Sequence, residues 1–153
     1  MIREKLTETL KDAMRAKNEA ATTTIRMINA AIKQKDIDVA RGRGDERISE
    51  DEILNLLQSL IKSRRESIEL YKQGARPDLV SKEEAEIAII ETFLPRQLDE
   101  EETKAAIRQI VASAGASSVK DMGKVMAALK TQYAGRLDMT KASGLVKQIL
   151  AAG

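Results

Sequence analysis

Apolar side chains recur in this chain every three to four residues, the spacing that places them along one face of an α-helix. The alternation of apolar and polar residues that is typical of a half-buried β-strand is scarce. Between the apolar positions stand mostly good helix formers, above all Ala, Glu, Lys, Arg and Gln. This pattern predicts an all-α protein.

Signals for the beginning and end of helices divide the chain into seven helical segments. Ser49 precedes Glu52 by three residues and Asp99 precedes Glu102 by three, which is the capping-box pattern that begins a helix. Gly74 is expected to stop the third helix. We expect a flexible loop at 41–45 and helices over 2–17, 19–40, 50–73, 77–92, 100–114, 119–133 and 139–151. Ser81 with Glu84 is a second possible start for the fourth of these helices.

The best candidate for a domain boundary is the segment Phe93–Leu98. Pro95 lies inside it, and the residue before a proline is disfavoured in a helix. We therefore predict an N-terminal helical domain of four helices over residues 1–95 and a small C-terminal three-helix domain over residues 96–153. The second domain is close to the lower size limit for independent stability.

The chain contains no Cys, no His and no Trp. Disulfides, thiolate nucleophiles, Cys or His metal sites and imidazole proton shuttles are therefore excluded. The many carboxylates lie in patterns typical of exposed helix surfaces, whereas acid–base catalysis needs a sheltered group with a perturbed pKa. We expect no catalytic residue, no metal and no cofactor.

No apolar run approaches the ~20 residues that a membrane-spanning helix needs. The N-terminal residues also lack the apolar stretch of a signal peptide. We expect a cytoplasmic protein that does not bind membranes.

Basic charge is concentrated in the C-terminal part of the chain. Residues 1–97 hold 18 basic and 18 acidic side chains, whereas residues 103–153 hold eight basic and two acidic ones. Such a surface can bind the phosphates of a nucleic acid, although lysine-rich helical surfaces without that role are common. Two Tyr and one Phe are too few for stacking several bases, so we expect recognition by shape.

Gly123 lies inside the predicted helix 119–133, where Gly costs about 1 kcal/mol relative to Ala. Two explanations stay open: a ligand approaches the backbone here, or a neighbouring helix of the same bundle packs closely.

Arg64 and Arg65 form a candidate secondary anion site on the third helix, because paired guanidinium groups grip phosphate or carboxylate well. The alternative, which the neighbouring Glu66 and Glu69 favour, is ion pairing on the helix surface.

Several motifs together resemble the GatB/YqeY family, specifically its stand-alone YqeY-like proteins. They are IKSRRESIELYKQGARPDL at 61–79, KEEAEIAIIETFLPRQL at 82–98, MGKVM at 122–126 and AGRLDMTKASGLVKQIL at 134–150. The resemblance implies a helical N-terminal region and a C-terminal domain similar to the tail of the B subunit of the tRNA-dependent Asp/Glu amidotransferase. In that enzyme the tail contacts tRNA, and similar domains are fused to some glutaminyl-tRNA synthetases.

The ATP- and glutamine-using parts of the amidotransferase have no counterpart in this chain. Carbon–nitrogen ligase activity with glutamine as amide donor is therefore a family association, and we expect no catalysis. We predict an accessory protein that binds tRNA or another structured RNA, with an aminoacyl-tRNA synthetase or an amidotransferase as candidate protein partner. The residues expected to meet RNA are Lys120, Gly123, Lys124, Arg136 and Lys141. The alternative is a helical protein–protein interaction module without an RNA role, which uses a groove between the two domains.

Overall fold

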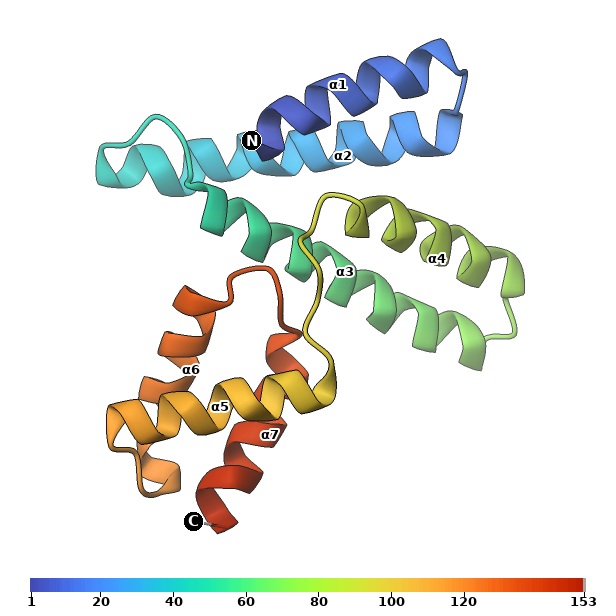
Figure 1. Ribbon diagram of the computed structural model, residues 1–153. Coiled ribbons are helices and arrows are strands. Elements are labelled where there is room, and N and C mark those ends of the chain that lie inside the picture. Colours follow the sequence, from blue (N-terminus) through green and yellow to red (C-terminus); the bar gives the residue numbers. More distant parts are fainter. Residues whose placement is uncertain (153) are drawn as a thin grey trace. The chain divides into compact units, whose positions relative to one another are not determined.

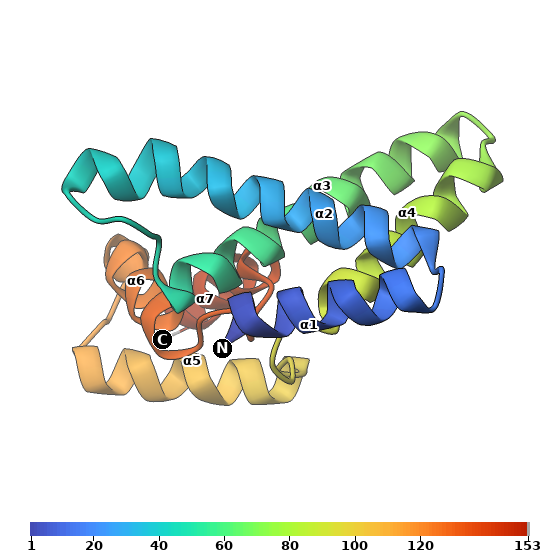
Figure 2. The same cartoon turned by 90° about the horizontal axis from the view of Figure 1, so that it is seen from above.

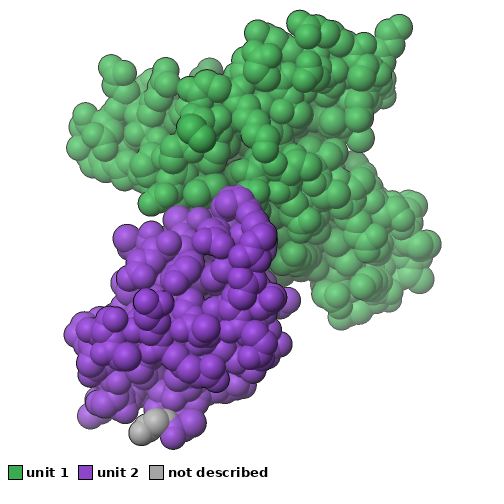
Figure 3. Space-filling model, viewed as in Figure 1, with its two compact units in different colours: residues 1–94 green, residues 95–153 purple. Residues whose placement is uncertain are grey.

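The computed structural model describes residues 1–152 of the 153-residue chain. Seven α-helices account for most of these residues and no strand occurs among them, which confirms the all-α class (Figure 1). The chain divides into two compact units, residues 1–94 and residues 95–153 (Figure 3). None of the described helices combines the length and the apolar content that spanning a bilayer requires.

Unit 1 consists of two helical hairpins. Helix α1 (Ile2–Arg15) lies beside α2 (Glu19–Lys35), and α3 (Glu50–Gln73) lies beside α4 (Pro77–Glu91), in both views (Figures 1 and 2). Helix α2 also packs against α4, so that one core joins the hairpins. Burying each large aliphatic side chain of that core contributes about 1.5–3 kcal/mol. The fully buried ones are Leu6, Ile25, Ile28, Ile53, Leu57 and Ile90.

The end of α2 differs from the expected flexible loop at 41–45. The helix continues as a π-helical turn (Asp36–Ala40) and a 3-10 turn (Arg41–Arg43). Gly44 then adopts the left-handed backbone conformation, with φ of 88°, and the amide of Asp45 donates to the carbonyl of Ala40 at 2.8 Å. Backbone hydrogen bonds thus pair carbonyls at the end of the helix, so this segment has a regular helical conformation and is not an irregular loop.

Helix α3 ends at Gln73 with Gly74 as its C-cap, so the predicted stop is confirmed, but the left-handed residue that follows the helix is the next one. Gly74 has an ordinary φ of −83°, and the left-handed residue after α3 is Ala75, with φ of 54°. The amide of Arg76 donates to the carbonyl of Tyr71 at 2.9 Å, the bond that closes this kind of helix end. The first helix, expected to reach residue 17, ends at Arg15 in the same way, with Lys17 at φ of 55°.

Unit 2 is a three-helix bundle. Helices α5 (Glu100–Ala114), α6 (Met122–Gln132) and α7 (Met139–Ala152) each pack against the other two, and a 3-10 turn (Val119–Asp121) precedes α6. Fully buried aliphatic side chains from all three helices fill the core. They are Ile107 from α5, Val125 and Leu129 from α6, and Val146 from α7.

The segment around Pro95 contributes to both cores. Phe93 is 4% exposed and belongs to the core of unit 1, whereas Leu98 packs against the core of unit 2. The amide of Leu98 donates to the carbonyl of Arg136 at 2.9 Å, and the side chain of Gln97 donates to the carbonyl of Gly135 at 2.5 Å. The start of unit 2 is thereby tied to its own α6–α7 turn.

Candidate nucleic-acid interface

The acidic side chains of unit 2 are engaged within the unit. Asp121 accepts a hydrogen bond from the amide of Ser117 at 3.0 Å, which lowers the pKa of its carboxyl below the ordinary value. Asp138 accepts from the amide of Thr140 at 2.9 Å and so caps the beginning of α7. Both acids of the otherwise basic stretch 103–153 therefore accept hydrogen bonds from backbone amides.

The other four acids begin α5, where they complement the helix dipole. Asp99 and Glu102 form the predicted capping box, with the amide of Glu102 donating to Asp99 at 2.7 Å. Glu102 also receives two hydrogen bonds from Arg96, at 2.9 and 2.7 Å. This guanidinium, together with the capping bonds at Asp99, lowers the pKa of Glu102 to about 2. Lys104 pairs with Glu100 at 3.3 Å and lies 3.7 Å from the fourth acid of this turn.

Most cations of unit 2 are exposed and lack an acidic partner. Within the described residues, the structure shows no ion pair for five exposed basic side chains of this unit. They are Arg108, Lys120, Lys130, Lys141 and Lys147. Since four of the six acids lie in the first turn of α5 and the other two accept hydrogen bonds from backbone amides, the remaining surface of unit 2 carries a net positive charge.

Lys124 and Arg136 differ from these because each bonds to a backbone carbonyl. The ammonium of Lys124 donates to Ala114, the last residue of α5, at 3.2 Å. The Nε of Arg136 donates to Arg96 at 3.2 Å. Lysine has three donors and arginine five, so both retain N–H groups for an external phosphate.

The five predicted RNA-binding residues fall into two groups. Lys120, Gly123 and Lys124 lie at the beginning of α6, whereas Arg136 and Lys141 follow its end. Helix α6 has 11 residues and is therefore about 16 Å long at 1.5 Å per residue. The structure brings three of the residues together at one end of this helix and two at the other, which suits an extended phosphate backbone better than a single small anion.

Gly123 is exposed, and a Cβ atom built on it meets nothing within 4 Å. Close packing against a neighbouring helix of the bundle, one of the two explanations left open by the sequence, is therefore wrong. Gly144 in α7 is equally open. An approach from outside the bundle stays as the explanation for Gly123.

The structure places Arg64 and Arg65 of unit 1 against carboxylates of α4. The Nε of Arg64 lies 2.9 Å from Glu86 and 3.8 Å from Glu83, and the side chain of Arg64 is 14% exposed. Arg65 lies 3.5 Å from Glu91. Ion pairing, the alternative to the secondary anion site, thus describes the observed contacts, although the partners come from α4.

Three cations of unit 2 lie outside the predicted set of RNA-binding residues. Arg108, Lys130 and Lys147 are exposed, whereas the chosen Arg136 is half-buried. Their positions opposite the apolar stripes of their helices were the available signal. Among the residues that the structure describes, no group of three or more acids is arranged to hold a metal ion.

A family model described as Yqey-like protein matches residues 3–150. The curated relatives include proteins named "Altered inheritance of mitochondria protein 41, mitochondrial". The one from Lachancea thermotolerans is 42% identical over 89 residues, and the one from Vanderwaltozyma polyspora is 38% identical over 89 residues. Each of these matches covers 58% of this chain and 46% of the relative. The matched region thus spans about half the length of these relatives.

Proposed function

The chain belongs to the YqeY-like protein family, and on this premise we propose that it is a non-catalytic accessory protein whose second unit binds structured RNA, tRNA first of all. One observation carries the proposal. All six acids of unit 2 are engaged in hydrogen bonds or ion pairs, while five exposed cations have no ion-pair partner in the described chain. A polyanion can bind to such a surface, because its phosphates neutralise the unpaired cations.

The choice of tRNA rests on the resemblance of the C-terminal domain to the tail of the amidotransferase B subunit. Recognition would follow the phosphate backbone, since unit 2 has a single aromatic residue, Tyr133, and it is half-buried. An aminoacyl-tRNA synthetase or an amidotransferase is the candidate protein partner. The protein alone, mixed with glutamine, ATP and misacylated tRNA, should transfer no amide.

The decisive experiment is a titration of labelled tRNA with the full chain at 50 and 200 mM salt. With about 3–5 phosphate contacts, log K falls with log salt at a slope near −0.9 per contact, so affinity should drop about 40- to 500-fold between these concentrations. Absence of binding at 50 mM salt would contradict the proposal.

The most informative variant combines Lys120→Glu with Lys141→Glu. Both side chains are exposed and neither holds the bundle together, unlike Lys124 and Arg136 with their bonds to carbonyls. We expect at least tenfold weaker tRNA binding at 50 mM salt. The matched control reverses the same charge at Lys62 and Lys82, which are exposed on helices of unit 1. Equal affinity of the two variants would refute an interface on unit 2.

The alternative, a protein-interaction module without an RNA role, predicts the opposite result. Affinity capture after nuclease treatment would then recover one protein in equal amounts with this chain, and tRNA would not bind at low salt.

The compartment is tested separately, by fractionating cells that produce the full-length protein. This distinguishes the cytoplasm, which we propose, from mitochondria, where the printed names of the curated relatives place those proteins.

A further inference from the structure

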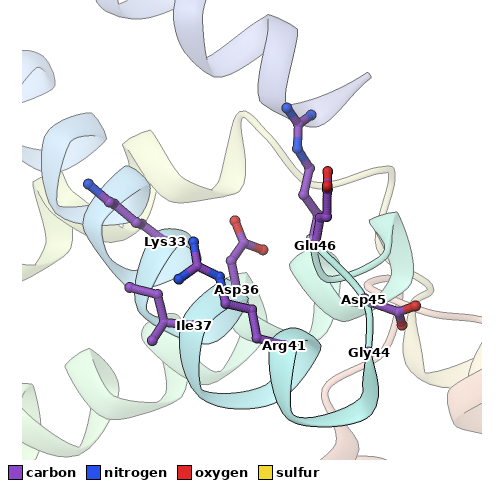
Figure 4. Close-up of a pocket in the computed structure, with 8 residues that line it drawn as sticks. Lys33, Asp36, Ile37, Arg41, Gly44, Asp45 and Glu46 are labelled. Atoms are coloured by element: carbon purple, nitrogen blue, oxygen red, sulfur yellow. The ribbon is translucent and has the colours of Figure 1, made fainter.

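Unit 1 contains a recess of about 520 Å³ at the far end of α2 (Figure 4). One wall is the helix with its π-helical and 3-10 extension, and the other is the segment that follows the reversal at Gly44. The volume lies in the range of small-molecule sites. The lining residues are Lys33, Asp36, Ile37, Arg41, Gly44, Asp45, Glu46 and Arg47.

Two of the three acids in the lining accept hydrogen bonds from arginines that do not line the recess. Asp36 receives two hydrogen bonds from Arg3, at 3.0 and 2.8 Å, and one from the amide of Ile48 at 2.9 Å. The guanidinium of Arg3, the largest cause, holds the pKa of Asp36 below its ordinary value. Asp45 lies 2.6 Å from the Nε of Arg43, a guanidinium that it shares with Glu52, and points away from Lys33 and Arg41 (Figure 4).

The three cations in the lining have no such partners. Within residues 1–152, no hydrogen bond or ion pair to the side chain of Lys33, Arg41 or Arg47 is found. Arg47 acts through space on Asp36 and Glu4 and contributes to the lowered pKa of both carboxyls. The recess has as many acidic as basic lining residues, but its three cationic side chains keep N–H groups without a hydrogen-bond partner in the described chain.

The spacing along the helix explains how these groups converge. Lys33, Ile37 and Arg41 are separated by four residues each, so that they lie on one face at successive turns. Arg47 reaches the recess from the opposite wall, after the left-handed Gly44 has turned the chain back. Ile37 is 41% exposed and adds an apolar surface between the two cations of the helix.

We propose that this recess binds a small phosphorylated molecule, with Lys33, Arg41 and Arg47 holding the phosphate oxygens. Guanidinium groups match phosphate oxygens in pairs and an ammonium adds a point charge, so three cations suit a group with two or more negative charges. The end of a helix disfavours an anion slightly, but the carbonyls of Ala40 and Arg41 at this end are already bonded. A recess of this size has room for a diphosphate or a nucleotide. The site is independent of the RNA-binding surface proposed on unit 2.

Calorimetric titration of the full chain with inorganic pyrophosphate at low salt tests the site. One equivalent should bind, and Arg41→Gln combined with Arg47→Gln should weaken binding at least tenfold. The matched control, Arg15→Gln with Arg26→Gln, removes two exposed guanidinium groups of the same unit that do not line the recess. It should change affinity by less than twofold. No heat of binding at 10 mM pyrophosphate, or equal weakening by both variants, overturns the proposal.

A second measurement needs no variant. Amide chemical shifts of the native protein should move on addition of pyrophosphate at Ile37, Gly44 and Glu46, and those at the start of α6 should not. Shifts confined to unit 2 would overturn the site. Displacement of pyrophosphate by tRNA at stoichiometric concentration would do so as well, because the recess would then be a contact for RNA phosphates and not a small-molecule site.

Discussion

The ammonium of Lys124 in α6 lies 3.2 Å from the carbonyl oxygen of Ala114, the last residue of α5. This bond joins a cation to the negative end of a helix dipole, and it connects two of the three helices of unit 2. Lys124→Gln should therefore lower the free energy of unfolding by about 1 kcal/mol. Urea unfolding followed by circular dichroism measures the change.

Lys130→Gln is the matched control for this prediction. Lys130 is exposed on the same helix and makes no ion pair among the described residues, so its loss should change stability by less than about 0.5 kcal/mol. If the two variants unfold at the same urea concentration, the bond from Lys124 contributes nothing to stability in solution.

The salt dependence of tRNA binding should report single phosphate contacts. Removing one lysine that neutralises a phosphate makes the slope of log K against log salt less negative by about 0.9. We expect this change for Lys141→Gln, measured by titration at four salt concentrations. Lys82→Gln on unit 1 should leave the slope unchanged, and a slope unaffected by both substitutions would remove Lys141 from the interface.

Gly123→Ala separates stability from RNA binding. No atom lies within 4 Å of the added Cβ, so the substitution should stabilise unit 2 by about 0.5–1 kcal/mol through helix propensity. If RNA approaches the backbone at this point, the same methyl group should weaken tRNA binding several-fold. Gly144→Ala, in similarly open space on α7, calibrates the stability gain. Stabilisation with unchanged tRNA affinity would leave Gly123 without a role in binding.

Ala75→Gly should stabilise unit 1 by about 1 kcal/mol, because Ala75 occupies the left-handed conformation with φ of 54° and an L-residue with a Cβ is strained there. Gly74→Ala should be neutral or slightly stabilising, since Gly74 has φ of −83° and an added Cβ meets only carbonyl oxygens at 3.6 and 3.9 Å. Thermal unfolding measures both. A destabilised Gly74→Ala variant would show that Gly74, and not Ala75, is the residue that ends α3.

This pair of residues shows what the sequence predicts well and what it misses. The apolar period and the capping boxes at Ser49 and Asp99 depend on local spacing, and the helices they predict are present within a few residues. The position of the left-handed residue depends on which hydrogen bonds close the helix end. A glycine one residue away gives no information about that choice.

The candidate site was predictable to a similar extent. The excess of basic residues after position 103 is a property of the sequence alone. The tertiary partners of the cations are not, because Arg64 meets Glu86 across 22 residues and Arg136 meets Arg96 across 40. The recess in unit 1 has an equal number of acidic and basic lining residues, so the contrast between its bonded acids and its unbonded cations appears only once the bonds of Asp36 and Asp45 are known.

Glu102 should make the stability of unit 2 depend on pH in acid. The hydrogen bonds from Arg96 and the capping bonds hold its pKa near 2 in the folded chain, against an ordinary value of 4.5. Because the folded pKa is the lower one, this carboxylate stabilises the fold above pH 4.5, and the contribution disappears as pH falls from about 4.5 to about 2.

Glu102→Gln should therefore unfold more easily than the native chain at pH 6, and the difference should shrink steadily below pH 4.5 and vanish near pH 2. Urea unfolding at pH 6, 4, 3 and 2 measures this convergence, and Arg96→Gln should reproduce it, because it removes the other half of the pair. Combining the two substitutions should then add little to either one. Parallel stability curves for native protein and Glu102→Gln across the whole range would show that the guanidinium of Arg96 does not hold this carboxylate in solution.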